Sequence, residues 1–392
     1  MRFFLALWVV MYHVSRLADN GAHVEWMPGA PPEALALLRT GYVAVTLFFI
    51  LSGFVLAYNY PLDKKWSHYE LSKFAIARFS RIYPAYFLGL LLVLPFIVYR
   101  VVKLFQPQLL GKEIFVAALN FLLLQAWIPQ TALTWNYPGW SLSNEAFFYL
   151  CFPFIGVLLW RISRTTHILL TGILLWALSL AIPLWVILAP VPGLGDVPAT
   201  ALNIDPSVHV LASLIGYNPL LRILEFCLGI LLGRLYFLLR TTHPRLSGRG
   251  YWFYLPGILG TGLLLSQADR LPLPLVNNGL LPLYACVILG LALEGGTVAR
   301  ILSAHPLVFL GNASYSMYIL HAPVMTYMLI LRKKLLPFWP LGLAWVMTYV
   351  LMMILLSSLV FKKVEEPLNR DLKRRLGKRL NRETGIKTEA IV

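Results

Sequence analysis

The chain has 392 residues, of which 59% are hydrophobic and only 13% are charged, and its formal net charge is +16. This composition excludes an ordinary soluble domain and indicates a polytopic membrane protein. The fold class we expect is an all-α helical bundle, because a bilayer requires every backbone group to be bonded internally and the apolar runs are far longer than the strands of a membrane barrel.

Ten apolar runs are long enough, or nearly so, to cross a bilayer as helices. In chain order they are residues 3–17, 41–58, 82–102, 146–160, 168–189, 220–239, 251–266, 275–293, 307–331 and 339–361. An eleventh segment, 114–128, is shorter and carries Asn120 and Gln125, so its length leaves it open as a span or a re-entrant piece.

The positions of Lys and Arg predict the orientation of these helices. Basic clusters in residues 64–81, 161–164 and 240–249 mark cytoplasmic loops, and these loops alternate correctly only if 114–128 does not cross. The prediction is therefore a multi-pass protein with about ten spans and both termini in the cytoplasm, although the basic residues 332–334 then fall on the opposite side.

The chain ends in a basic segment, in which nine Lys or Arg stand against three acidic residues between Lys362 and Arg382. Beside so much apolar sequence, this excess favours a cytoplasmic tail over a nucleic-acid-binding segment. We predict a membrane domain over residues 1–361 and a basic cytoplasmic tail over 362–392, with membrane lipid and no nucleic acid among the partners.

Two polar side chains bound the first apolar run. Arg2 and His13 are eleven residues apart, which in a helix is a net rotation of about 20° and a rise of about 16 Å, so both share one face. A cation and an imidazole on a membrane helix are expected to face a protein interior or a hydrated cavity. His13 is the best candidate for a general base, since imidazole accepts and returns a proton near neutral pH. A buried histidine bonded to a neighbouring helix is the alternative.

A polar stretch, 140–145, leads into the fourth apolar run. Glu145 is expected in the first turn of this helix, with Tyr149 one turn later on the same face and Ser141 or Ser143 as the cap. A carboxylate near a helix N-terminus is electrostatically favourable, so a structural role competes with orienting a histidine or binding a sugar hydroxyl.

Arg78 and Arg81 lie at helical spacing where a basic loop enters the span 82–102. Topological anchoring accounts for Arg78. For Arg81, fixing an anionic group such as phosphate is an equal alternative, because the guanidinium offers a fork of donors.

Ser314, Tyr318 and His321 form a polar stripe at i, i+4 and i+7 of the ninth run. We predict interhelical hydrogen bonds for Ser314 and Tyr318. For His321, packing and substrate contact are balanced alternatives.

Three further features are interpreted as structural. Ser52 and Gly53 inside a span are expected to permit close helix approach. Glu365 and Glu366, after the last span, are expected to pair with Arg or Lys. The three cysteines have no paired spacing, so we expect small core residues rather than a disulfide framework or metal site at Cys151, Cys227 and Cys286.

With these residues in view, the chain resembles the acyltransferase 3 family of integral membrane acyltransferases. Five elements occur in the family's order and cover nearly the whole chain. They are the Arg-x10-His pair of Arg2 and His13, Phe-Phe-x-Leu-Ser-Gly-Phe at 48–54, Arg-x-x-Arg-x-x-Pro at 78–84, a stretch beginning Trp-Ser-Leu-x-x-Glu at 140–149, and Gly-x-x-Ser-Tyr-x-x-Tyr-x-x-His at 311–321.

The resemblance implies an O-acetyltransferase that moves an acyl group, usually acetyl from acetyl-CoA, to a hydroxyl of a cell-envelope or exported glycan. It makes His13 the proton-handling residue, Arg2 its companion and Glu145 a third catalytic residue. The mechanistic hypothesis is that Arg2 or Arg81 holds the phosphates of the acyl donor, and Arg78 is a further candidate for binding this donor. The expected substrate contacts are Trp140, Tyr149, Tyr318 and His321.

The same resemblance implies a bacterial inner (cytoplasmic) membrane location and acyl-CoA as the donor. No metal is expected, because the sequence shows no metal-ligand cluster. The acceptor would be an exopolysaccharide or lipopolysaccharide, with polysaccharide-biosynthesis proteins as partners. A transporter or flippase of a lipid-linked glycan is the competing hypothesis, because it also places cations and histidines around a cavity. A membrane scaffold without catalysis is the third.

Overall fold

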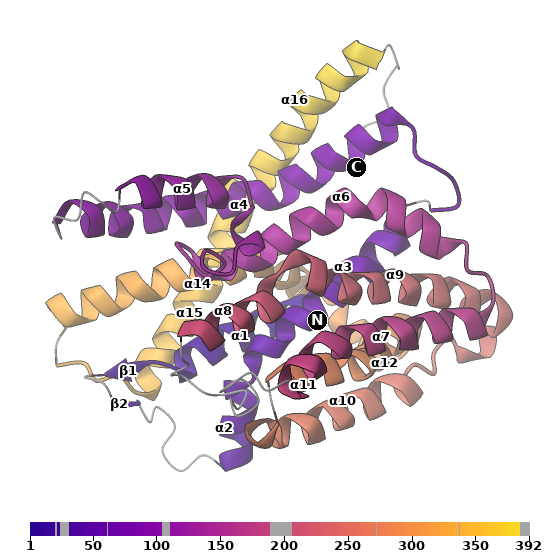
Figure 1. Cartoon of the computed structure of the whole chain (residues 1–392), viewed down its shortest axis with the longest axis horizontal. Coiled ribbons are helices and arrows are strands. Elements are labelled where there is room, and N and C mark those ends of the chain that lie inside the picture. Colours follow the sequence, from indigo (N-terminus) through magenta and orange to yellow (C-terminus); the bar gives the residue numbers. More distant parts are fainter. Residues whose placement is uncertain are drawn as a thin grey trace. The chain divides into compact units, whose positions relative to one another are not determined.

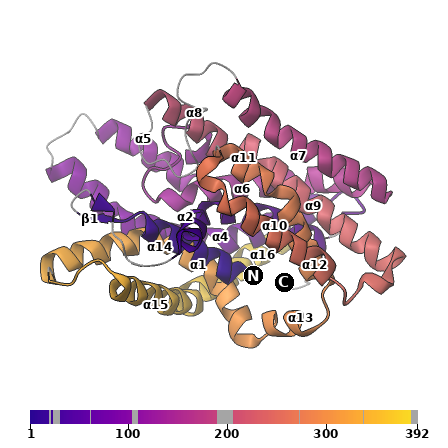
Figure 2. The ribbon, with the colours of Figure 1, turned by 90° about the horizontal axis from the view of Figure 1, so that it is seen from below.

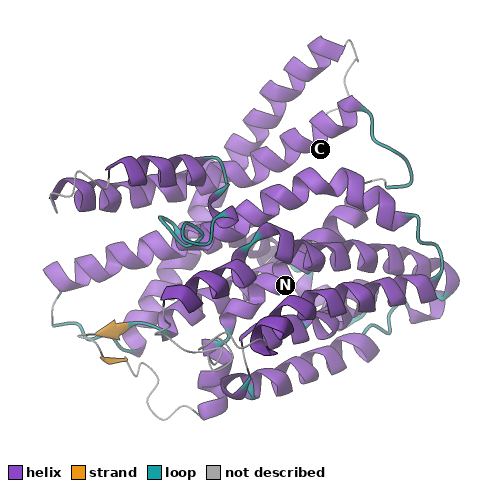
Figure 3. Cartoon of the chain, in the orientation of Figure 1, coloured by secondary structure: helices purple, strands orange, loops and turns teal. Residues whose placement is uncertain are grey.

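The computed structural model describes residues 1–19, 22–23, 31–60, 62–103, 110–188, 206–271, 273–336 and 338–384. Almost all of these residues lie in helices (Figure 3). Among them the strands β1 (Ala18–Asp19) and β2 (Ala22–His23) form one short antiparallel pair. The all-α class expected from composition is therefore confirmed. The chain divides into two compact units, unit 1 being Met1–Lys64 with Phe154–Val308 and unit 2 being Lys65–Pro153 with Phe309–Val392.

Unit 1 is a helical bundle in which α9 has the most neighbours. Its elements are α1 (Arg2–Ser15), α2 (Pro32–Arg39), η1 (Gly41–Val43), α3 (Ala44–Asn59), α7 (Thr165–Leu188), α8 (Pro206–Tyr217), α9 (Pro219–Thr242), η5 (Pro244–Leu246), α10 (Tyr251–Ser266), η6 (Ala268–Arg270), α11 (Leu273–Gly279), α12 (Leu281–Leu293) and α13 (Thr297–Leu302). Helix α9 packs against α3, α7 and α12. Helix α10 packs along α12 (Figure 2).

Unit 2 is built around a long helix, α4. Its elements are α4 (His68–Lys103), α5 (Leu110–Phe121), η3 (Gln125–Trp127), η4 (Tyr137–Gly139), α6 (Trp140–Trp160), α14 (His305–Leu335), α15 (Leu343–Val360), the π-helical turn η7 (Phe361–Glu365) and α16 (Glu366–Thr384). Of α6 only the part up to Pro153 belongs to this unit, and of α14 only the part from Phe309. Helix α4 has 36 residues, and α16 packs against it (Figure 1).

Small residues bring α3 and α9 together. A Cβ atom added at Gly53 would lie 2.1 Å from the carbonyl oxygen of Phe226, and one added at Gly229 would lie 2.0 Å from the carbonyl oxygen of Ile50. The two backbones are therefore in direct contact, as small residues permit in membrane helices. The prediction of close helix approach is confirmed for Gly53, and it stays a prediction for Ser52.

The basic end of the chain forms a helix as far as the structure describes it. Helix α16 covers Glu366–Thr384, and Tyr69 in α4 donates from its hydroxyl to Asn381 Oδ1 at 3.0 Å. Residues 385–392 of the predicted tail lie outside the described residues. The division of the chain at residue 361 stays a prediction, but α16 itself packs within unit 2.

The eleventh apolar segment, 114–128, is only partly helical. Helix α5 has 12 residues and ends at Phe121, a length of about 18 Å against a hydrocarbon core of about 30 Å. The chain then turns at Leu123, which has a φ of 58°. Ser143 donates from its hydroxyl to the Leu123 carbonyl at 2.6 Å. This bend supports a re-entrant piece rather than a span.

Six described helices are long and apolar enough to cross a membrane. They lie within Gly41–Asn59, His68–Lys103, Tyr137–Trp160, Thr165–Trp185, Leu275–Leu293 and Leu343–Asn381. Helices α1, α9, α10 and α14 are not among them. Helix α1 has 14 residues, α10 has 16, and α9 carries four charged side chains. A multi-pass membrane protein is thereby supported, and the count of ten spans stays a prediction.

Candidate active site

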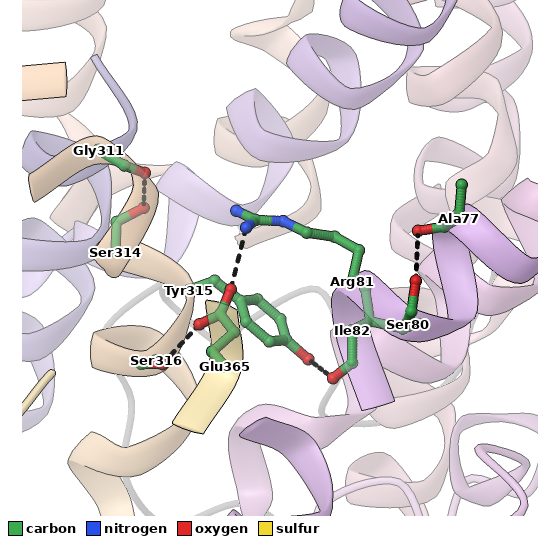
Figure 4. Close-up of polar contacts among 9 residues, drawn as sticks. All are labelled: Ala77, Ser80, Arg81, Ile82, Gly311, Ser314, Tyr315, Ser316 and Glu365. Carbon is green, nitrogen blue, oxygen red and sulfur yellow. Dashed lines mark hydrogen bonds and ion pairs between the residues drawn. The ribbon is translucent and has the colours of Figure 1, made fainter. Parts of the chain in front are cut away.

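An ion pair in unit 2 joins α4 to the π-helical turn after α15. Arg81 Nη1 donates to Glu365 Oε1 at 3.0 Å, and Ser316 Oγ donates to Glu365 Oε2 at 2.6 Å (Figure 4). The Glu365 side chain is fully buried, whereas 24% of the Arg81 side chain is exposed. Both carboxylate oxygens therefore have partners, and part of the Arg81 side chain is accessible. The prediction that Glu365 pairs with a basic side chain is confirmed.

Tyr315 lies beside this ion pair. Its hydroxyl donates to the carbonyl of Ile82 in α4, and its ring centroid is 6.0 Å from the Arg81 guanidinium carbon (Figure 4). The hydroxyl also interacts electrostatically with Glu145 and Tyr149. Tyr315 therefore joins α14 to α4 beside the Arg81 ion pair. The sequence offered no periodic signal for it, because it lies one residue away from the polar stripe of α14.

Arg78 lies against aromatic rings in the same unit. Its guanidinium carbon is 5.8 Å from the ring centroid of Phe74 and 6.0 Å from that of Tyr149. Tyr149 donates its hydroxyl to Glu145 Oε1, one turn earlier in α6. The expected pairing of Glu145 with Tyr149 on one face is confirmed. Glu145 is not in the first turn, however, because α6 begins at Trp140.

Lys373 on α16 adds a third cation to this region. Helix α16 packs against α4, the helix of Arg78 and Arg81, and the Lys373 ammonium group is within electrostatic range of both arginines. Glu365 is the carboxylate paired with Arg81. We call Arg78, Arg81 and Lys373 the cationic cluster of unit 2. Like charges that are held close together favour binding of a polyanion, because the anion relieves their repulsion.

The serines at the start of α6 do not cap the helix, contrary to the prediction. Ser141 donates from its hydroxyl to the Pro138 carbonyl at 3.0 Å and bonds to the Tyr318 hydroxyl at 2.8 Å. Ser143 binds the Leu123 carbonyl instead. Because η4 continues directly into α6, both serines lie inside the helix, and their hydroxyls bond to carbonyls of the segments that precede it.

The polar stripe of α14 is buried, and its members have different partners. Tyr318 bonds to Ser141 of α6, which confirms the interhelical bond predicted for it. Ser314 donates to Gly311 in its own helix at 2.8 Å, so that prediction is wrong. His321 is fully buried, its Nδ1 contacts the Tyr318 carbonyl and its ring packs edge-on to another aromatic ring. Packing is thereby favoured for His321, and its substrate contact stays a prediction.

Trp140 is the first residue of α6 and is 9% exposed. Like Tyr149, Tyr318 and His321, it belongs to unit 2. Unit 2 therefore contains all four of the predicted substrate contacts, together with Glu145 and the two arginines expected to bind the donor.

Arg2 and His13 belong to unit 1, where both lie in α1 and are half-buried. The helix runs without interruption from Arg2 to Ser15, so the shared face inferred from their spacing holds. Helix α1 packs against α2, η1 and α3. The ring of His13 lies edge-on to that of Tyr12, with centroids 4.7 Å apart.

Unit 1 also buries a charged pair that sequence reasoning missed. Arg222 Nη1 lies 3.0 Å from Glu225 Oε1 in α9, with side-chain exposures of 6% and 3%. Arg222 Nη2 donates to Thr46 Oγ1 at 2.9 Å, and its guanidinium faces the ring of Phe49. Two charges three residues apart in an apolar run were the available signal, since such residues inside membranes usually have a function.

The described residues contain no group of three or more His, Cys, Asp or Glu side chains that could hold a metal ion. Cys151, Cys227 and Cys286 are free thiols; Cys227 is buried and the other two are half-buried.

Buried ion pairs and polar side chains within apolar helices define a multi-pass membrane protein with an internal polar site. Comparison with known proteins assigns the chemistry. Residues 1–362 match the model of the acyltransferase 3 family, described as "Acyltransferase domain". The chain is 30% identical over 336 residues to Acyltransferase MdmB of Streptomyces mycarofaciens, covering 83% of this chain and 78% of that protein.

A second relative is Protein 2 in picA locus of Rhizobium radiobacter. It is 34% identical over 137 residues, which cover 31% of this chain and 67% of that protein. No solved structure was found to match the chain. The protein is a membrane acyltransferase and belongs to the acyltransferase 3 family.

Proposed function

We propose that this acyltransferase moves an acetyl group from acetyl-CoA to a hydroxyl of a cell-surface or exported polysaccharide. The cationic cluster of unit 2 is the observation that carries the donor assignment. The protein would lie in the bacterial cytoplasmic membrane with both termini in the cytoplasm, alongside the proteins that synthesise the glycan. Membership of an acyltransferase family favours this enzyme over a glycan transporter.

The cationic cluster fits the phosphates of the donor. Arg78 is oriented by two aromatic rings and Arg81 by Glu365, so neither guanidinium needs to be ordered on binding. Lys373 supplies a compact third charge from α16. Guanidinium groups bind phosphate oxygens through paired N–H donors, and a lysine adds a point charge. These three side chains would hold the donor through its phosphates.

Glu145 and Tyr149 support the donor site in this proposal. The Tyr149 ring faces Arg78, and its hydroxyl is held by Glu145. Glu145 is therefore a positioning residue for the arginine rather than a base. Trp140, buried at the start of the same helix, would fix the orientation of α6.

His13 is the proposed general base, with Arg2 on the same face of α1. The sugar hydroxyl gives its proton to the imidazole as its oxygen attacks the thioester carbonyl, the carbon–sulfur bond breaks, and the proton passes to the departing thiolate. A relay in which His13 itself carries the acetyl group satisfies the same balance. Arg2 would stabilise negative charge that develops during the transfer.

Acetyl transfer in membrane vesicles tests this function. Vesicles containing the full chain are supplied with labelled acetyl-CoA, and label is measured in the envelope polysaccharide. We expect His13→Ala to lower the rate by about a hundredfold or more, as for loss of a general base. His167→Ala, at an exposed position of α7, is the matched control. Equal labelling in His13→Ala and wild type at equal protein levels would refute the proposal, and glycan translocation without labelling would favour a transporter.

A further inference from the structure

The buried pair in α9 belongs to a larger set of polar side chains in unit 1. We call this set the α9 polar cluster; its members are Tyr12, Tyr42, Tyr217, Arg222, Glu225 and Tyr284. They come from five separate elements: α1, η1, α8, α9 and α12. None of them is used in the function proposed above.

The members of the cluster are related by one ring contact and by electrostatic interactions. The rings of Tyr12 and Tyr42 lie edge-on, with centroids 5.4 Å apart. Tyr217 interacts electrostatically with both Tyr12 and Arg222. Tyr284 interacts in the same way with Tyr42 and Glu225. The elements that carry these side chains also pack against one another, α1 against η1, and α8 and α12 against α9.

Burial increases along the cluster. Tyr12, Tyr42 and Tyr217 are half-buried, whereas Glu225 and Tyr284 are each 2% exposed. The three half-buried tyrosines therefore form the accessible end of the cluster. Its buried end, which we call the floor, consists of Arg222, Glu225 and Tyr284. Aromatic side chains together with a few polar groups are the usual lining of a small-molecule site.

Two polar atoms of the floor lack a partner among the described residues. They are Oε2 of Glu225 and the hydroxyl oxygen of Tyr284. An unmatched buried polar group is costly and requires an explanation. Glu225 and Tyr284 lie on α9 and α12, two helices that pack against each other, and these two atoms do not hydrogen-bond to each other. One hydroxyl placed between them would satisfy both, by donating to Glu225 and accepting from Tyr284.

We propose that the α9 polar cluster binds the acceptor, and that the acceptor is a neutral sugar ring whose hydroxyl bridges Glu225 and Tyr284. This inference rests on the proposed function, because it takes His13, the neighbour of Tyr12, as the base. Arg222 and Glu225 neutralise each other, so the floor favours an uncharged ligand over an anionic one. Aromatic rings at the accessible end provide apolar surface for the faces of a sugar.

Kinetics with simple acceptors test the assignment. The purified full chain in detergent receives acetyl-CoA and one of four neutral p-nitrophenyl glycosides: glucoside, galactoside, mannoside or N-acetylglucosaminide. Acetylated glycoside is measured by mass spectrometry. We expect at least one of them to be acetylated by wild type and not by His13→Ala.

For that glycoside, Glu225→Gln should raise the acceptor KM about tenfold or more, because a hydrogen bond to a charged group is lost. Tyr284→Phe should raise it about threefold to tenfold. In both variants the KM for acetyl-CoA should stay within about twofold of wild type, a split that a purely structural role or a bound water would not produce. Tyr254→Phe, at a buried tyrosine of α10 outside the cluster, is the matched control.

Each result decides one of the two proposals. Release of CoA from acetyl-CoA, followed with a thiol reagent, tests the proposed function, and its absence in wild type would count against that function. Release that depends on His13 but acetylates none of the glycosides would overturn the sugar assignment. Wild-type acceptor KM in both Glu225→Gln and Tyr284→Phe would overturn it as well. If Glu225→Gln does not accumulate, Tyr284→Phe decides, because it removes a single oxygen atom.

Discussion

The contact between α3 and α9 predicts a large effect from a single methyl group. In Gly53→Ala the new Cβ would lie 2.1 Å from the Phe226 carbonyl oxygen, whereas carbon–oxygen contacts between packed backbones are about 3.3–3.6 Å. The two helices would have to separate by more than about 1 Å, because a backbone atom cannot rotate away as a side chain can. Overpacking of this kind costs about 1–3 kcal/mol, and the backbone contact places Gly53→Ala at the upper end.

Helix propensity partly offsets this cost. Alanine is about 1 kcal/mol more favourable than glycine within a helix. The expected net loss of stability for Gly53→Ala is therefore about 2 kcal/mol. Gly262→Ala in α10 is the matched control, because a Cβ there meets nothing within 4 Å. That control should be neutral or should gain up to about 1 kcal/mol.

Thermal unfolding of the detergent-solubilised chain, followed by size-exclusion chromatography, measures the difference. Gly53→Ala should lower the midpoint temperature by several degrees, and Gly262→Ala should not lower it. Gly229→Ala should resemble Gly53→Ala, since its Cβ would lie 2.0 Å from the Ile50 carbonyl oxygen. The double variant should lose less than the two single losses combined, because one separation of the helices relieves both clashes. Equal midpoints for Gly53→Ala and Gly262→Ala would refute the reasoning.

Three further outcomes concern unit 2. Arg81→Ala should raise the KM for acetyl-CoA about tenfold in steady-state assays, as expected for a lost hydrogen bond between charged groups, and an unchanged donor KM would exclude Arg81 from phosphate binding. Glu365→Ala should lower the unfolding midpoint by the equivalent of about 1–2 kcal/mol. This loss of stability is smaller than for a fully buried ion pair, because Arg81 is partly exposed. An unchanged midpoint would contradict this prediction. A double-mutant cycle of Ser141→Ala and Tyr318→Phe should give a coupling energy of about 1 kcal/mol, whereas additive losses would indicate that their hydrogen bond contributes nothing.

Several features of the candidate site could be predicted because each depends on the geometry of one helix. Arg2 and His13 share a face of α1, and Glu145 meets Tyr149 in α6, since i+4 and i+11 positions align in any helix. The prediction that Ser141 or Ser143 caps α6 was wrong for a related reason. The start of α6 depends on the preceding turn, and η4 continues into the helix without the break that a cap would need.

Other contacts could not be predicted, because they join residues far apart in the chain. Arg81 and Glu365 are separated by 284 positions, and no local pattern specifies which basic side chain a buried carboxylate will meet. Tyr315 and Lys373 have the same property. The small-residue spacing of Gly229 and Gly233 was a readable signal of close helix packing, but only the fold identifies α3 as the partner.

The sequence by itself determined the class of the protein. Its apolar runs require helices in a membrane, and its five ordered motifs indicated the acyltransferase 3 family that the comparisons established. Only the tertiary structure decided which partners from distant helices the charged side chains meet, namely Glu365 for Arg81 in unit 2 and the hydroxyl of Thr46 for Arg222 in unit 1. The physical reason is that hydropathy and helical periodicity act over a few residues, whereas a buried charge takes its partner from whichever helix the packing places beside it.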